Sequence, residues 1–132
     1  EGGYEPWVIC LDEMARAQPS IQERMIKVVE NARQTRFVFC FSDTASIIDP
    51  IRERGMIIAL PLPTADEATS ALLRIAASEG LSLDAIVARQ IAESVKRVPR
   101  RCVLALEQAA VLSNSTTIDL DSAVKACSMI AR

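Results

Sequence analysis

The chain has 132 residues, half of them apolar, and a formal net charge of −2 at pH 7. This length and apolar content fit about one globular domain with a buried core, and they exclude a disordered tail. Because basic and acidic residues are mixed along the chain, we expect no overall basic field of the kind that marks nucleic-acid-binding proteins. The absence of histidine excludes histidine-based catalysis and most zinc sites.

The four cysteines, Cys10, Cys40, Cys102 and Cys127, lie inside apolar runs without C-x-x-C spacing. This pattern predicts buried, reduced thiols in a cytosolic or nuclear protein. The chain begins with Glu1 rather than Met, so we expect it to be a fragment of a longer protein.

The first half of the chain alternates between strand and helix signals. Residues 7–11 form a continuous apolar run, which is typical of a buried strand in a parallel sheet. From Ser20 onward, apolar residues recur at helical spacing, and Ser20 and Glu23 have the spacing of a capping box. Residues 37–41 form a second apolar run. A strand–helix–strand unit is therefore predicted.

A short helix and a third strand are expected next. Residues 49–55 contain an aspartate cap, a proline in the first turn and a terminating glycine, which predict a very short helix. The apolar residues 56–60 predict a third strand. A proline-rich stretch then ends the strand signals, so we expect a domain boundary that separates residues 1–61 from residues 62–132.

The second half of the chain is predicted to be a small bundle of four helices with no strand. Thr64 and Glu67 have the spacing of a capping box, and the helix that they open is expected to stop at Gly80. The later helices are expected to begin at Asp84, at Pro99, and at Asp119 or Asp121.

Two acidic residues, Asp12 and Glu13, directly follow the first predicted strand. An apolar strand followed by Asp-Glu has the form of a Walker B element, in which the first carboxylate orients hydrated Mg²⁺ and the second polarises the water that attacks the γ-phosphate of ATP. The carboxyl ends of parallel strands are also where α/β sheets bind ligands. The alternative is that these acids only end a buried strand and enter solvent.

Longer stretches of the chain carry a more specific pattern. The first stretch runs from Leu11-Asp12-Glu13 through Gln22 to Glu30. The others are Thr35-Arg36-Phe37, residues 47–54, Glu79-Gly80-Leu81 and residues 97–107. These stretches resemble the L-D-E, A-Q-x-A-L-R-R-T-M-E, T-R-F, I-I-x-P-I-x-S-R-C, E-G-L and N-L-R-x-A-L segments of the small subunits of replication factor C. That family consists of AAA+ clamp loaders. The resemblance implies an α/β fold: the C-terminal part of an AAA+ nucleotide-binding domain, with parallel strands and helices, followed by an all-helical lid.

The resemblance also implies roles for individual residues. Ser42 falls where the family commonly has the sensor-1 asparagine, and a hydroxyl offers a shorter reach and one fewer donor than an amide. Arg54 falls on the arginine finger that acts in trans on the ATP site of the neighbouring subunit, where the adjacent Glu53 could pair with it and weaken its action. The alternative is a solvated arginine near the C-terminus of a helix. Arg100 falls on the sensor-2 arginine, with Arg101 as an alternative; a basic surface cluster is the simpler explanation for both.

The resemblance implies ATP or ADP and Mg²⁺ as cofactors of the full-length protein, with Asp12 holding the metal through water. No G-x-x-x-x-G-K-[ST] phosphate-binding loop is present, so this fragment alone is expected to bind and hydrolyse no ATP. The implied partners are the other clamp-loader subunits of a hetero-pentamer, the sliding clamp and primer–template DNA, in the nucleus of a eukaryote. The alternatives are a non-hydrolysing scaffold subunit of the same ring, or another AAA+ ATPase such as a bacterial clamp-loader subunit.

Overall fold

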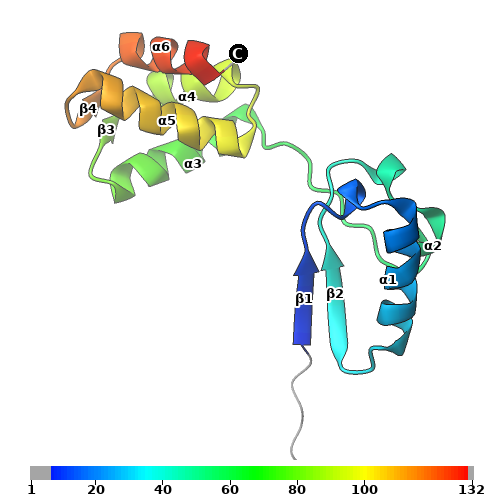
Figure 1. The fold of residues 1–132 in the computed structure, drawn as a ribbon. Helices are drawn as coiled ribbons and strands as arrows, with labels where there is room; N and C mark the ends of the chain where they lie inside the picture. The colour runs from blue at the N-terminus through cyan, green and yellow to red at the C-terminus, as the bar shows by residue number, and fades with distance from the viewer. Residues whose placement is uncertain (1–6, 131–132) are drawn as a thin grey trace, which may run out of the picture. The chain divides into compact units, whose positions relative to one another are not determined.

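A computed structural model describes residues 7–130 of the chain, which divides into two compact units, residues 1–59 and 60–132 (Figure 1). The first unit contains strands and helices, and the second is almost entirely helical. Among residues 7–130, no helix combines the length and the hydropathy needed to cross a membrane.

The first unit is built on a strand–helix–strand connection. Strand β1 (Trp7–Leu11) pairs in parallel with β2 (Thr35–Phe39), and helix α1 (Pro19–Asn31) connects them. The register places Trp7 opposite Thr35 and Leu11 opposite Phe39. The short helices η1 (Met14–Arg16), η2 (Thr44–Ser46) and α2 (Asp49–Arg52) follow the carboxyl ends of the strands (Figure 1). The predicted parallel α/β arrangement is confirmed.

Helix α1 begins two residues earlier than a cap at Ser20 would place it. Its cap residue is Gln18, no side chain caps it, and Pro19 occupies the first turn. The fixed φ of proline suits this position, where the backbone N–H is not needed. Ser20 therefore lies inside the helix, and the capping box predicted for Ser20 and Glu23 is wrong.

The predicted third strand at residues 56–60 is also wrong. This segment has no regular secondary structure, and Met56 and Leu60 are 86% and 89% exposed. A strand requires a neighbouring backbone to receive its hydrogen bonds. In the described part of this unit the only sheet is the pair of β1 and β2, and residues 56–60 do not join it.

The second unit packs four helices around one core. They are α3 (Ala65–Ser78), α4 (Ala85–Ser94), α5 (Pro99–Ser113) and α6 (Leu120–Ile130). Leu72, Ile91 and Val95 are fully buried there, together with small residues such as Ala105 and Ala109. The alanines allow the helices to approach closely, so the core depends on small side chains as much as on large ones.

Two short strands in the helical unit were not predicted. Strand β3 (Ser82–Leu83) pairs in parallel with β4 (Thr117–Ile118), and Ser82 also donates its N–H to the Thr116 carbonyl at 2.7 Å. Two residues are too few to produce a recognisable apolar alternation. The pair connects the segment before α4 to the segment before α6.

The predicted helix caps in this unit are present. Thr64 and Glu67 form the reciprocal capping box of α3, and the N–H and hydroxyl of Thr64 hold the pKa of Glu67 below its ordinary value. Asp84 caps α4 by accepting the Ile86 N–H. Of the two candidates for α6, Asp119 accepts from the Ser122 N–H at 2.8 Å.

The cysteine prediction holds for one unit and fails in the other. Cys102 and Cys127 are buried in the helical core, and desolvation raises the pKa of both thiols. Cys10, in β1, is exposed, and Cys40, directly after β2, is half-buried; their sulfur atoms lie 3.6 Å apart. The prediction of burial is wrong for Cys10 because none of the described residues covers that face of β1.

Candidate functional site

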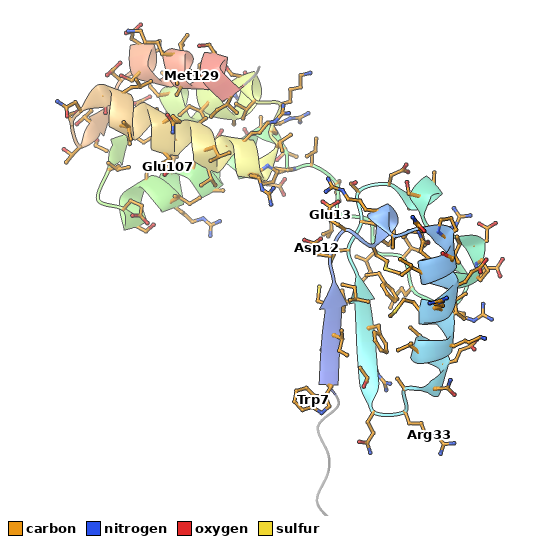
Figure 2. The ribbon with its side chains drawn as sticks, in the orientation of Figure 1. Trp7, Asp12, Glu13, Arg33, Glu107 and Met129 are labelled. Atoms are coloured by element: carbon orange, nitrogen blue, oxygen red, sulfur yellow. The ribbon has the colours of Figure 1, made fainter. Side chains whose placement is uncertain are left out.

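Asp12 and Glu13 lie at the carboxyl end of β1, where both side chains are exposed (Figure 2). Ser42 follows the end of the neighbouring strand β2. The two ends are joined by the Cys40 N–H, which donates to the Leu11 carbonyl at 2.9 Å, and by the Met14 N–H, which donates to the Cys40 carbonyl at 3.3 Å. Because the strands are parallel, the acidic pair and Ser42 come from the same edge of the sheet.

The turn after β1 holds Glu13 in an unusual conformation. Its φ is +55°, in the left-handed region that residues with a side chain seldom occupy. Its N–H donates to Asp12 Oδ1 at 2.9 Å, which orients the Asp12 carboxylate relative to the backbone of the turn. Strained positions of this kind are frequent at functional sites.

Glu13 also forms an ion pair inside this turn. Its Oε2 lies 2.8 Å from Nε of Arg16, and both side chains are largely exposed. An exposed pair of this kind contributes only about 0–1 kcal/mol, so it is easily exchanged for another partner. In this arrangement the carboxylate of Glu13 is oriented toward Arg16.

The donor atoms at this edge fit a magnesium ion bound largely through water. Asp12 provides carboxylate oxygens, and Oδ2 has no hydrogen-bond partner among residues 7–130. In the same residues, no group of three or more acidic or cysteine side chains is close enough to hold a metal ion by itself. Mg²⁺ is commonly held by one or two carboxylates with water and substrate phosphates, so a single aspartate is sufficient on the protein side.

Arg54, just beyond α2, is held by two contacts from its own unit. Its Nε lies 2.8 Å from Oε1 of Glu30, near the end of α1, and its Nη1 donates to the Pro50 carbonyl at 2.8 Å. The ion pair is made with Glu30, 24 positions earlier, and not with the adjacent Glu53. Helices α1 and α2 lie side by side, which brings the two residues together (Figure 1).

Gln22 is a buried polar residue whose role the sequence did not indicate. It is 1% exposed, and its Nε2 donates to the carbonyls of Ala17 and Ser46, both at 3.0 Å. Its Oε1 accepts the Ile48 N–H at 3.0 Å. Gln22 therefore joins the segment after the acidic turn to the segment that leads into α2 and Arg54. The signals were its place in the stretch that resembles replication factor C and a glutamine in an amphipathic helix, a pattern that equally suits a solvated side chain.

In the helical unit, Arg100 lies in the first turn of α5, directly after Pro99. Arg100 and Arg101 are both exposed, so the structure does not distinguish between them. An apolar pocket of about 260 Å³ lies beside this helix start, and its lining includes Pro63, Leu72 and Pro99. The helix start thus combines basic side chains with an apolar wall.

Comparison with known proteins identifies relatives for most of the chain. Replication factor C small subunit 2 of Pyrobaculum aerophilum is 32% identical over 127 residues, which are 94% of this chain and 39% of that protein. Replication factor C subunit 3 of Mus musculus is 29% identical over 113 residues, 85% of this chain and 32% of that protein. The chain is homologous to replication factor C subunits. The resemblance expected from the motifs is confirmed.

The homologues are considerably longer than this chain, which spans about a third of the mouse replication factor C subunit. No family model matches the chain. Among solved structures, the Holliday junction branch migration motor RuvB of Thermotoga maritima superposes with a TM-score of 0.78 at 19% identity, covering 92% of this chain and 44% of that one. This likeness concerns the fold alone, and it confirms the predicted fold class.

The roles that the replication factor C pattern implies for Asp12, Glu13, Ser42, Arg54 and Arg100 stay predictions. The first unit brings the acidic pair and Ser42 to one edge of the sheet, and it places Arg54 beyond α2 against the end of α1. Arg100 belongs to the second unit.

Proposed function

We propose that the chain is the Walker B to lid portion of an ATPase subunit of a replication factor C clamp loader. The observation that carries this proposal is the strained Asp12-Glu13 turn at the carboxyl end of β1, beside the end of β2, in a chain homologous to replication factor C subunits. Residues 1–61 would be the partial nucleotide-binding domain, and residues 62–132 the lid.

In this proposal each residue has a distinct task. Asp12 orients a water-bound Mg²⁺, which when bound neutralises charge on the β- and γ-phosphates of ATP. Glu13 leaves Arg16 and polarises the attacking water, and the Ser42 hydroxyl hydrogen-bonds that water or the γ-phosphate. Arg54 acts on the site of the neighbouring subunit, and Arg100 contacts the nucleotide of its own site from the lid.

The wider assembly follows from the same proposal. The subunit would join a hetero-pentamer, act on the sliding clamp and on primer–template DNA, and reside in the nucleus if the source is a eukaryote. The ATP would be held between subunits, and its hydrolysis would switch the ring between states that bind clamp and DNA differently.

The direct test is Glu13→Gln in the full-length protein, purified in its native assembly, with ATP turnover as the measurement. Loss of a general base lowers turnover at its site by about 10²–10⁴-fold. The matched control is Glu79→Gln, an exposed glutamate at the end of α3, which should leave turnover unchanged. Turnover that is equal in both variants would contradict an active site at Asp12 and Glu13.

A second candidate function is a non-hydrolysing scaffold subunit of the same ring. Ser42 in place of an asparagine favours it, and so does the ion pair that occupies Glu13. In a scaffold subunit, Glu13→Gln should leave the ATP turnover of the ring unchanged, because Glu13 belongs to an inactive site. Arg54→Ala should lower that turnover, because Arg54 would act on the active site of the neighbouring subunit. The same two variants therefore separate the candidates.

A further inference from the structure

Two of the three guanidinium nitrogens of Arg54 are held by its own chain, and the third has no partner among the described residues. Nε is bound by Glu30, and Nη1 donates to the Pro50 carbonyl, both at 2.8 Å. Arginine has five N–H donors in a rigid plane. Nη2 has no hydrogen-bond partner among residues 7–130, so its two N–H donors are available to a ligand.

The two holding groups come from rigid elements. Glu30 lies in the last turn of the 13-residue helix α1, and Pro50 lies in the first turn of α2. Gln22 fixes α1 to the segment just before α2 through the Ser46 carbonyl and the Ile48 N–H. Helix α1 therefore contacts the segment around α2 at two points, through Gln22 near its start and through Glu30 near its end. Together these contacts set the position of Glu30 relative to Arg54.

The ion pair between Arg54 and Glu30 orients the guanidinium but is too weak to prevent Arg54 from binding another partner. The side chains of Arg54 and Glu30 are 46% and 49% exposed, so solvent screens their attraction. A free arginine side chain samples many rotamers, and fixing its plane before a ligand arrives reduces the entropy lost on binding. Arginine held in this way suits the flat, two-point recognition of phosphate oxygens.

We propose that Glu30 is the positioning residue for Arg54: it holds the guanidinium by Nε so that Nη2 is presented to phosphate oxygens of a nucleotide bound to the neighbouring subunit. The inference rests on the proposed function of Arg54 as a finger acting in trans. It adds a second residue to that function, one that touches no nucleotide itself.

The test uses the full-length protein in its purified assembly, with kcat and KM for ATP as the measurements. The turnover that depends on Arg54 is the difference between the unsubstituted assembly and Arg54→Ala. Glu30→Ala is expected to lower this turnover roughly two- to fivefold, the range of an exposed ion pair, mainly through kcat. Glu30→Gln keeps an acceptor for Nε and should retain most of the turnover. Glu23→Ala, an exposed glutamate of the same helix, is the matched control and should change nothing.

A double substitution separates positioning from general damage. With Arg54→Ala already present, adding Glu30→Ala should have no further effect, whereas damage to the fold would lower turnover again. Unchanged or higher kcat for Glu30→Ala, with Arg54→Ala impaired, would overturn the inference and leave the finger intact. If Arg54→Ala itself has no effect while Glu13→Gln does, the finger is absent and the inference falls with it.

Discussion

The hydrogen bonds of Gln22 predict a specific local effect when they are removed. Gln22→Met preserves the length and flexibility of the side chain but eliminates the bonds to the Ala17 carbonyl, the Ser46 carbonyl and the Ile48 N–H. These main-chain groups are only partly buried, so water replaces some of what is lost. At about 1 kcal/mol for each bond, the connection should weaken by roughly 2–4 kcal/mol.

Amide hydrogen exchange measures this loss where it occurs. A factor of ten corresponds to about 1.4 kcal/mol, so peptides that cover residues 44–52 should exchange at least roughly 30-fold faster in Gln22→Met. Peptides from α5 should be unaffected, because that helix belongs to the other unit. The control is Gln90→Met, an exposed glutamine of α4 that bonds only Ser94. If exchange in residues 44–52 is the same in both variants, Gln22 does not hold this segment. The contact that fixes α1 to the segment before α2, on which the position of Glu30 beside Arg54 depends, is then absent.

Three further predictions concern the helical unit. Thr64→Ala removes the side-chain cap of α3 and should lower the unfolding midpoint in urea by an amount equivalent to about 0.5–2 kcal/mol, with Thr64→Ser near wild type. Ala109→Leu overpacks a fully buried site and should destabilise by about 1–3 kcal/mol, whereas Ala77→Leu on the exposed surface should not. Hydrogen bonds from the N–H and hydroxyl of Ser122 lower the pKa of Asp119. The stability that this carboxylate contributes is therefore present above its unfolded pKa, near 3.9, and is lost as pH falls through the lower folded pKa. Between pH 5 and 2, the thermal unfolding midpoint of Asp119→Asn should fall less than that of the unsubstituted protein.

Most features that depend on neighbouring residues were predictable from the sequence, although the capping box expected for Ser20 and Glu23 does not form. The capping box of Thr64 and Glu67 needs only four residues, and it occurs where it was expected. The same is true of the aspartate cap at Asp84. Strand β1 was recognised from its continuous apolar run, which is typical of strands in parallel sheets. Its predicted burial is wrong, because Trp7 to Cys10 are exposed among the described residues. The edge that carries Asp12 and Glu13 followed from that strand.

Features that depend on distant residues were not predictable in this way. Residues 56–60 have the composition of a strand, but pairing requires a neighbouring backbone that composition cannot supply. Glu53 is the candidate partner next to Arg54 in sequence, yet Glu30 reaches Arg54 across the contact between α1 and α2. The three bonds of Gln22 also connect positions up to 26 residues apart. Each failure concerns a contact made by tertiary packing rather than by local preference.

Helix α1 connects the two parts of the first unit to which we assign function in the proposal, the acidic turn and Arg54. It follows the acidic turn through η1, and its last turn holds Arg54. Gln22 and Glu30 are eight residues apart, which corresponds to about 12 Å along a helix at 1.5 Å per residue. Because a helix of this length moves as a rigid body, a displacement at the Asp12-Glu13 turn would be transmitted to Glu30 and so to the guanidinium. If Asp12, Glu13 and Arg54 act as proposed, the state of the nucleotide at one site should alter the arginine that reaches the neighbouring site, because α1 is linked to both groups of residues.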